Sequence, residues 1–219
     1  MIKNSIRYIS IILLLVNSSC ATNAKVSIDN QVSSEIKGKE FTIVSRENNL
    51  LNFSSSSFLT NFVGVIIPYG LVWIPKMNGK KQAERYNLQD QAPVFKKDIS
   101  KTLATKYNMR LKDNSIITAE DDIKKLSEIY KDYAYVIDIS DVGSLTYVKL
   151  DDHRFDFHVI FKMIDTKQSK VIAQSTCSYS TNKDNYKPKS FYLNNEAENL
   201  KKEISAAVTQ CLGVLKAEI

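Results

Sequence analysis

FDFHVIFKM, residues 155–163, has an apolar side chain at every second position. The apolar set consists of Phe155, Phe157, Val159, Phe161 and Met163. A period of two is typical of a strand with one buried face. A short turn, DTKQS at 165–169, separates this strand from KVIAQSTCSYS at 170–180, which is rich in β-branched residues. We therefore predict an antiparallel hairpin in the C-terminal part of the chain.

Helices and further strands are predicted on both sides of this hairpin. A helix from about Asn195 carries one apolar stripe, which consists of Leu200, Ile204, Ala207, Val208, Cys211 and Leu215. Upstream, a helix is predicted to begin near Asp90 and Pro93. Apolar residues then recur at helical spacing, namely Val94, Phe95, Ile99, Leu103 and Tyr107. The side facing water carries Lys96, Lys97, Lys101 and Lys106. A second helix follows Thr118, which we expect to cap it.

Strands are predicted at EFTIVSR (40–46), near 115–117 and at YAYVIDIS (133–140). Together these elements predict an α/β (α+β) fold with a single domain. It has a mixed sheet of about four to five strands with an antiparallel C-terminal hairpin, covered by about three helices.

The start of the chain has the layout of a signal peptide. Lys3 and Arg7 precede the apolar run ISIILLLV at 9–16. This run is too short to span a bilayer, which requires roughly 20 apolar residues. We therefore expect residues 1–19 to direct export and to be removed.

The residues after this run, NSSC at 17–20, resemble the lipobox of bacterial lipoproteins. The resemblance implies that Cys20 becomes the first mature residue and carries acyl chains such as palmitate. Asn17 stands where the family usually has an aliphatic residue. Ala21 follows the cysteine, which in this family favours the periplasmic face of the outer membrane. The alternative is an ordinary cleaved signal followed by a chance cysteine.

The remaining chain divides into a tether and a domain. Residues 20–38 are mostly polar and are expected to form a flexible tether about 25 Å long on average, leaving 39–219 as the α/β domain. Within the domain, 58–75 is an apolar insertion broken by Gly64, Pro68 and Gly70. It is either buried against the core or exposed as an interaction surface, for which the candidates are Val65, Ile67, Leu71 and Trp73.

The chain has three cysteines. If lipid uses Cys20, Cys177 and Cys211 remain as a pair, and we predict a disulfide between them in an oxidising compartment. The alternative is two buried free thiols, because both lie on apolar faces.

A family resemblance follows from the segments IDTKQSKVIAQSTC (164–177), NNEAENLKKEISAAVTQCLGVLKAEI (194–219) and NLQDQAPVFKKDISKTLATKYN (87–108). They resemble a family of uncharacterised Gram-negative outer-membrane lipoproteins, and the matching residues are Asp165, Thr166, Lys170, Val171, Ala173, Cys177 and Cys211. More distantly, the order of elements is similar to curli-secretion and penicillin-binding-protein-activator lipoproteins and to the N-terminal domain of the Tol translocation protein. The shared motifs are structural and imply no catalytic residue.

Composition argues against several kinds of chemistry. The 219 residues are 43% hydrophobic and 25% charged, with 6 glycines and 2 histidines. A net charge of +6 is too mild and dispersed to indicate nucleic-acid binding. The only metal-ligand cluster is Asp151, Asp152, His153, Asp156 and His158, and its spacing favours a solvated polar face over a metal site.

We therefore expect no catalytic residues, no metal and no cofactor. The predicted function is a non-enzymatic lipoprotein, held at the membrane by its lipid, that binds another envelope protein. The alternatives are a binder of a small apolar or lipidic ligand, with residues 58–75 as a lid, and, least favoured, a metal-assisted hydrolase.

Overall fold

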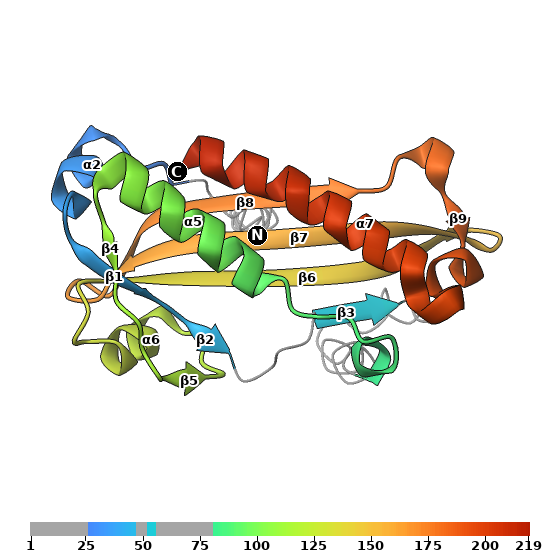
Figure 1. Cartoon of the computed structure of the whole chain (residues 1–219), viewed down its shortest axis with the longest axis horizontal. Helices are drawn as coiled ribbons and strands as arrows, with labels where there is room; N and C mark the ends of the chain where they lie inside the picture. Colours follow the sequence, from blue (N-terminus) through green and yellow to red (C-terminus); the bar gives the residue numbers. More distant parts are fainter. Residues whose placement is uncertain (1–25, 47–51, 56–80) are drawn as a thin grey trace, which may run out of the picture.

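A mixed sheet of seven strands forms the centre of the part of the chain that the computed structural model describes, residues 26–46, 52–55 and 81–219 (Figure 1). The strand order is β4-β1-β6-β7-β8, with β3 beside β6 and β9 beside β7. Their bounds are Glu40–Ile43 for β1, Asn52–Ser55 for β3, Arg110–Leu111 for β4, Tyr135–Lys149 for β6, Asp152–Asp165 for β7, Lys170–Ser180 for β8 and Lys187–Pro188 for β9. The mixed α+β class predicted from the sequence is confirmed.

Strand direction changes along the sheet. β1 runs parallel to both β4 and β6, and β3 also runs parallel to β6. β6, β7 and β8 form an antiparallel meander in which Ile139 lies opposite Phe161, and Val159 lies opposite Cys177. The predicted hairpin is therefore confirmed: β8 has the predicted bounds, and β7 is longer than the sequence pattern indicated.

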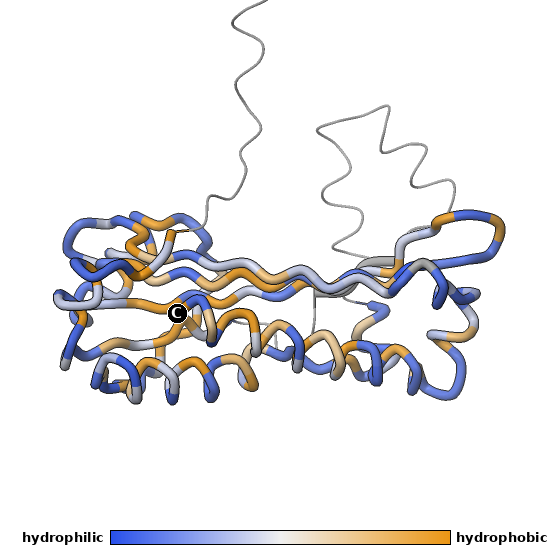
Figure 2. The backbone as a smooth tube through the Cα atoms, turned by 90° about the horizontal axis from the view of Figure 1, so that it is seen from above, coloured by the Kyte–Doolittle hydropathy of each residue, from blue (hydrophilic) through white to orange (hydrophobic). Residues whose placement is uncertain are grey.

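Two helices cover one face of this sheet and enclose the main core (Figures 1 and 2). They are α5, Ala92–Tyr107, and α7, Lys189–Glu218. The five apolar residues of the alternating stretch all point toward these helices and are fully buried. The rings of Phe95 on α5 and Phe157 on β7 stack with centroids 6.4 Å apart. Burying each such side chain contributes roughly 1.5–3 kcal/mol.

Local signals set the bounds of α5. The Asp90 carboxylate accepts a hydrogen bond from the Ala92 amide at 2.8 Å, and Asn108 ends the helix in the left-handed region at φ 55°. Phe95, Ile99 and Leu103 are buried as predicted, whereas Val94 is 44% exposed. Val94 lies one position away from Phe95, which is about 100° around a helix, so the two side chains cannot share a face.

The last helix is interrupted near its start. Residues 194–197 leave helical geometry, and Asn195, Glu196 and Ala197 have positive φ angles. The long regular part therefore begins after Ala197, close to the predicted start at Asn195. Its stripe from Leu200 to Leu215 is buried, as predicted.

A smaller layer packs on the opposite face of the sheet. It consists of α6, Ile123–Ile129, and a separate parallel pair made of β2, Ser45–Arg46, and β5, Ile117–Thr118. Leu126 and Tyr130 pack there against Val136 and Ile164. Asp122, not the predicted Thr118, caps α6 by accepting a hydrogen bond from the Lys125 amide at 3.0 Å.

The predicted flexible tether is wrong for residues 26–38. Val26 and Gln174 exchange two backbone hydrogen bonds at the edge of β8, and α2, Asn30–Ile36, begins at the capping residue Asp29. Val32 and Ile36 are four residues apart on α2 and place one helical face against the core, where Ile36 is fully buried, and Ile28, just before the helix, packs there too. Among the described helices, none is both long and apolar enough to cross a membrane.

Candidate functional site

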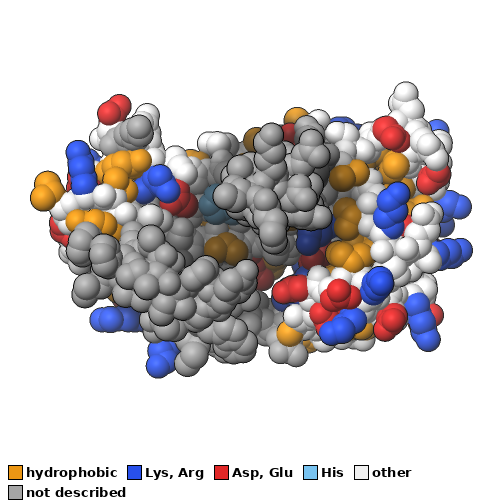
Figure 3. Space-filling view, turned by 180° about the vertical axis from the view of Figure 1, so that it is seen from behind, with side chains coloured by type: hydrophobic (Ala, Val, Ile, Leu, Met, Phe, Trp, Pro, Cys, Tyr) orange, Lys and Arg blue, Asp and Glu red, His pale blue; other side chains and the backbone are white. Residues whose placement is uncertain are grey.

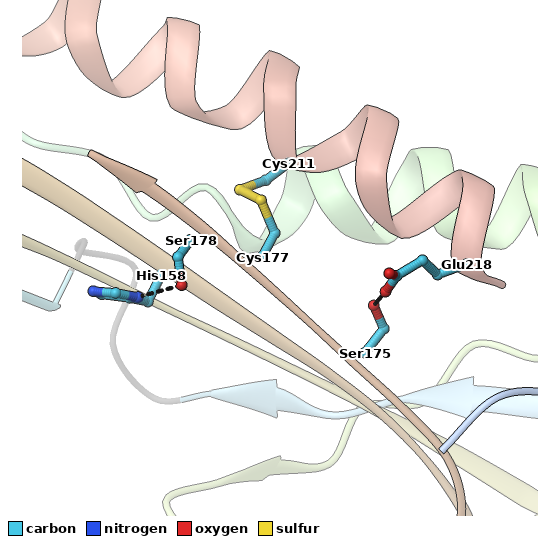
Figure 4. The surroundings of a disulfide bond; sticks show 6 residues. All are labelled: His158, Ser175, Cys177, Ser178, Cys211 and Glu218. Carbon is cyan, nitrogen blue, oxygen red and sulfur yellow. Dashed lines mark hydrogen bonds between the residues drawn. A yellow bond between two sulfur atoms is a disulfide. The ribbon is translucent and has the colours of Figure 1, made fainter. Parts of the chain in front are cut away.

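The disulfide predicted from the sequence joins β8 to α7 (Figure 4). The Cα atoms of Cys177 and Cys211 are 5.4 Å apart. Both residues are buried, and Ser175, on the same face of β8, bonds to Glu218 near the end of α7. The alternative of two free thiols is therefore wrong for this structure.

The other face of the meander carries a surface that we call the open face. Its members are Ser140 and Val142 on β6, His158 and Ile160 on β7, and Thr176 and Ser178 on β8. Five of the six side chains are exposed, and Ile160 is half-buried. Figure 3 views the molecule from this side, where acidic and basic side chains are interspersed at the end that carries α6 and β5. The open face, by contrast, combines hydroxyl and apolar groups with one imidazole.

The acidic and histidine cluster of residues 151–158 does not converge on one point. His153 faces the helices, is buried, and lies edge-on to the Tyr147 ring with centroids 5.7 Å apart. His158 points to the opposite face, where its Nδ1 lies 2.9 Å from the Ser178 hydroxyl (Figure 4).

Asp156 is engaged in structural contacts. It is buried, with its carboxylate 2.8 Å from Arg154 Nε and accepting hydrogen bonds from the hydroxyls of Ser180 at 2.6 Å and Thr146 at 3.0 Å. Across the described residues, no three or more His, Cys, Asp or Glu side chains are grouped to hold a metal ion.

A cavity of about 340 Å³ lies at the carboxyl ends of β1 and β4. One wall consists of the end of β1 and Ser45 after it, and a second consists of the end of β4 and the residues up to Asn114. The first half of α5 forms the third wall. We call this cavity the lysine pocket, because its lining includes Lys96 and Lys97 from α5 and Lys112 from the segment after β4. Ligands of open α/β sheets bind at this end of parallel strands.

Asn114 fixes the shape of the lysine pocket. Its side-chain amide donates to the Thr42 hydroxyl at 2.5 Å and to the Ile43 carbonyl at 3.0 Å, and its side-chain oxygen accepts from the Ile116 amide at 3.0 Å. The Lys112 amide donates to the Phe41 carbonyl at 2.8 Å. These bonds tie the segment after β4 to β1, so the wall that carries Lys112 is held in place.

The electrostatics of the lysine pocket are cationic. Lys96 is half-buried, and burial lowers its pKa, although Asp90 and Asp138 act in the opposite direction. Lys112 Nζ lies 5.4 Å from the centroid of the Tyr133 ring. Asp113 is the acidic residue of the lining, and it is exposed. The pocket is thus suited to an anion.

A second hollow, of about 470 Å³, lies at the opposite ends of these strands. Its lining carries Glu40 and Asp132 among its cations, and Arg110 there pairs with Glu40 at 3.6 Å. Its cations outnumber its acids, as they do in the lysine pocket, but one of them is already neutralised by this pair.

Several sequence-predicted positions lie outside the described residues. These are the lipidation residue Cys20 and the interaction candidates Val65, Ile67, Leu71 and Trp73. In contrast, the lysine pocket was missed, because helical spacing assigns Lys96 and Lys97 to the wet side of α5. The pocket could have been found from the pattern of two parallel strands, β1 and β4, connected through α5. That pattern depends on recognising β4, which has only two residues.

Comparisons with known proteins find only weak likeness. No known protein family matches the sequence, and no curated protein does. The lipoprotein GNA1162 of Neisseria meningitidis is 13% identical with a TM-score of 0.27, over 78% of this chain and 96% of that one. The protein CT253 of Chlamydia trachomatis is 11% identical with a TM-score of 0.35, over 83% and 97%. A minor lipoprotein of Acinetobacter baumannii is 9% identical with a TM-score of 0.32, over 82% and 91%. Similarity at this level carries no inference about function.

Proposed function

We propose that this chain is an exported lipoprotein, anchored through Cys20 to the periplasmic face of the outer membrane, whose domain is a non-enzymatic module that binds another envelope protein. The disulfide between Cys177 and Cys211 gives the strongest support, because it uses two of the three cysteines and leaves Cys20 for lipid. Disulfides persist in oxidising compartments outside the cytosol. Several acyl chains on one residue hold a protein at the membrane almost permanently.

The bridge between Val26 and Gln174 sets the distance between anchor and domain. Because Val26 is fixed to the edge of β8, the connection from Cys20 spans six residues, which reach at most about 20 Å when fully extended. A lipid on Cys20 would therefore keep β8 near the membrane surface, where other envelope proteins are concentrated.

The open face supports the protein-binding part of the proposal. The centres of protein–protein interfaces are depleted in charged residues. The six residues of the open face include no Lys, Arg, Asp or Glu, the charged residues Asp138, Asp156 and Lys162 lie at the next positions on the same face, and Val142 exposes 39% of its surface there. Its three strands are hydrogen-bonded to one another, so the backbone is already ordered and a partner would dock without reordering it.

Lipidation is tested by growing cells with labelled palmitate. The wild-type chain and the Cys177→Ser/Cys211→Ser variant are expected to take up label, whereas Cys20→Ser is expected to lose it and to appear in the soluble periplasmic fraction. Label retained in Cys20→Ser, or its absence from the wild type, would contradict the anchor.

Protein binding is tested by photo-crosslinking in living cells. A photoreactive amino acid at Thr176, in the open face, is expected to give discrete protein adducts, and the same amino acid at Val94, exposed on α5, serves as the matched control. Adducts at Val94 alone, or none at Thr176, would refute the open face as the docking surface. Lipid adducts at Ile67 would instead favour the lipidic-ligand alternative.

A further inference from the structure

In the described part of the chain the three lysines of the lysine pocket form no close ion pair, although the Asp90 and Asp138 carboxylates attract Lys96 from further away. The ion pairs found there, all with nitrogen-to-oxygen distances of 4.0 Å or less, do not include Lys96, Lys97 or Lys112. Desolvating a cation without a partner costs free energy. Because Lys96 is half-buried, the folded protein bears part of this cost, and an anion in the pocket would offset it.

The type of cation indicates which anion fits. Lysine presents a compact point charge with three donors, and it is a common ligand of phosphate oxygens. Arginine, whose planar fork binds carboxylate and phosphate alike, is not among the residues that line the pocket, so the anion would be held by the point charges of the lysines. Lysines from two separate elements, α5 and the segment after β4, line the cavity, so different oxygens of one phosphate group can accept hydrogen bonds from both sides.

The size and rim of the pocket suit a small phosphate-bearing ligand. A volume of about 340 Å³ lies at the lower end of ligand pockets in general. Leu111 belongs to the lining and is 47% exposed, so it offers an apolar contact to the carbon part of a ligand. The hydrogen bonds of Asn114 hold the wall in place before any ligand arrives, which reduces the entropic cost of binding.

We propose that the lysine pocket binds a phosphate group, with Lys96, Lys97 and Lys112 as its ligands. The source of that group is either a free phosphate or the headgroup of an anionic phospholipid, and both offer the same chemistry to the pocket. This binding goes beyond the docking of a protein partner and does not depend on it. The pocket lies at the β1 and β4 side of the sheet, whereas the open face lies on β6, β7 and β8.

Calorimetry on the purified full chain distinguishes the two sources. One arm titrates inorganic phosphate, and the other titrates phosphatidylcholine vesicles with or without phosphatidylglycerol. Lys96→Gln and Lys112→Gln each remove a charge from the pocket. Lys101→Gln removes the same charge from α5 at an exposed position outside the pocket lining and is the matched control. Urea unfolding of each variant confirms that the fold is retained.

Phosphate binding that weakens about tenfold in Lys96→Gln and Lys112→Gln, but not in Lys101→Gln, would support a site for free phosphate. Binding only to vesicles with phosphatidylglycerol, with the same dependence on Lys96 and Lys112, would support a headgroup site. If the chain binds neither phosphate nor the vesicles, the proposal is overturned. An equal loss of affinity in all three variants would also overturn it, because the ligand would then be attracted by net charge alone.

Discussion

Cys177 on β8 and Cys211 on α7 are joined by a disulfide that closes a segment with a sequence separation of 34. In the unfolded chain the bond keeps Cys177 and Cys211 together and so restricts the conformations of the segment between them. Replacing both cysteines by alanine is expected to lower the free energy of unfolding by roughly 3 to 4 kcal/mol, because the unfolded chain gains conformational entropy. Urea unfolding with and without reductant measures this loss. Reductant should destabilise the wild type and leave the double variant unchanged, and a wild type insensitive to reductant would contradict the prediction.

Stability is also expected to depend on pH through Asp141. This residue lies on the helix-covered side of β6, is 9% exposed, and accepts a hydrogen bond from the Gln91 amide at 3.2 Å. Burial raises the pKa of Asp141 from 3.8 to about 7, and the nearby Asp90 carboxylate adds to the shift.

Because the folded state holds the proton more tightly than the unfolded state, this contribution is complete below the ordinary pKa of 3.8 and is lost as pH rises through about 7. The free energy of unfolding should fall by about 2 to 3 kcal/mol between roughly pH 5 and pH 8. Asp141→Asn keeps the neutral form and should remove most of this slope while raising stability at the higher pH. Urea unfolding at both values measures it, and an unchanged slope in Asp141→Asn would refute the assignment.

Arg46 joins the smaller layer to the sheet. Its guanidinium is 2.5 Å from the Asp138 carboxylate, which is 6% exposed, and 2.9 Å from Asp121, which is 83% exposed. Arg46→Met should lower the free energy of unfolding by about 3 to 5 kcal/mol, because the Asp138 charge stays buried without its partner.

Asp121→Asn is the control, with an expected loss of about 1 kcal/mol or less, since that pair is exposed to water. The double variant Arg46→Met/Asp138→Leu should recover much of the stability lost in Arg46→Met. A double-mutant cycle measures the coupling. Equal losses in Arg46→Met and Asp121→Asn would show that the burial of Asp138 is not the cause.

Thr166 follows the turn-forming Asp165 and ties that turn to the start of β6. Its hydroxyl donates to the Tyr133 carbonyl at 2.5 Å, and the residue is 7% exposed. Thr166→Val keeps the shape but removes the donor, so we expect a loss of about 1 kcal/mol in unfolding free energy. Thr176→Val, an exposed position on β8, is the control and should change little. Thermal unfolding compares the two, and equal stabilities would count against a role for this hydroxyl.

The sequence predicts those parts of the fold whose pattern is local. β7 is recognisable because Phe155 to Met163 alternate, and α7 is recognisable because Leu200 to Leu215 recur at helical spacing. The cysteine pair follows from counting. For β7 and α7 the signal lies within one element, and for the cysteines it lies in their number, so none of the three requires knowledge of spatial neighbours.

The parts that escaped prediction depend on contacts between distant segments. β4 has two residues, both exposed, so it carries no apolar pattern. In the sequence Val26 lies in a mostly polar stretch, and nothing local indicates that its backbone pairs with that of Gln174. Lys96 faces water on an isolated helix, and it becomes half-buried only because β1 and the segment after β4 close around it.

Some strand pairs of the sheet are close in sequence and others are far apart, so they form at different times during folding. β6, β7 and β8 pair with their neighbours in sequence, so they can close quickly, whereas β1 must find β6 across the long segment between Phe41 and Tyr135. Chains emerge and fold from their N-terminal side. Both partners of β1 come later in the chain, first β4 and then β6, so until they are made the backbone groups of β1 remain unpaired.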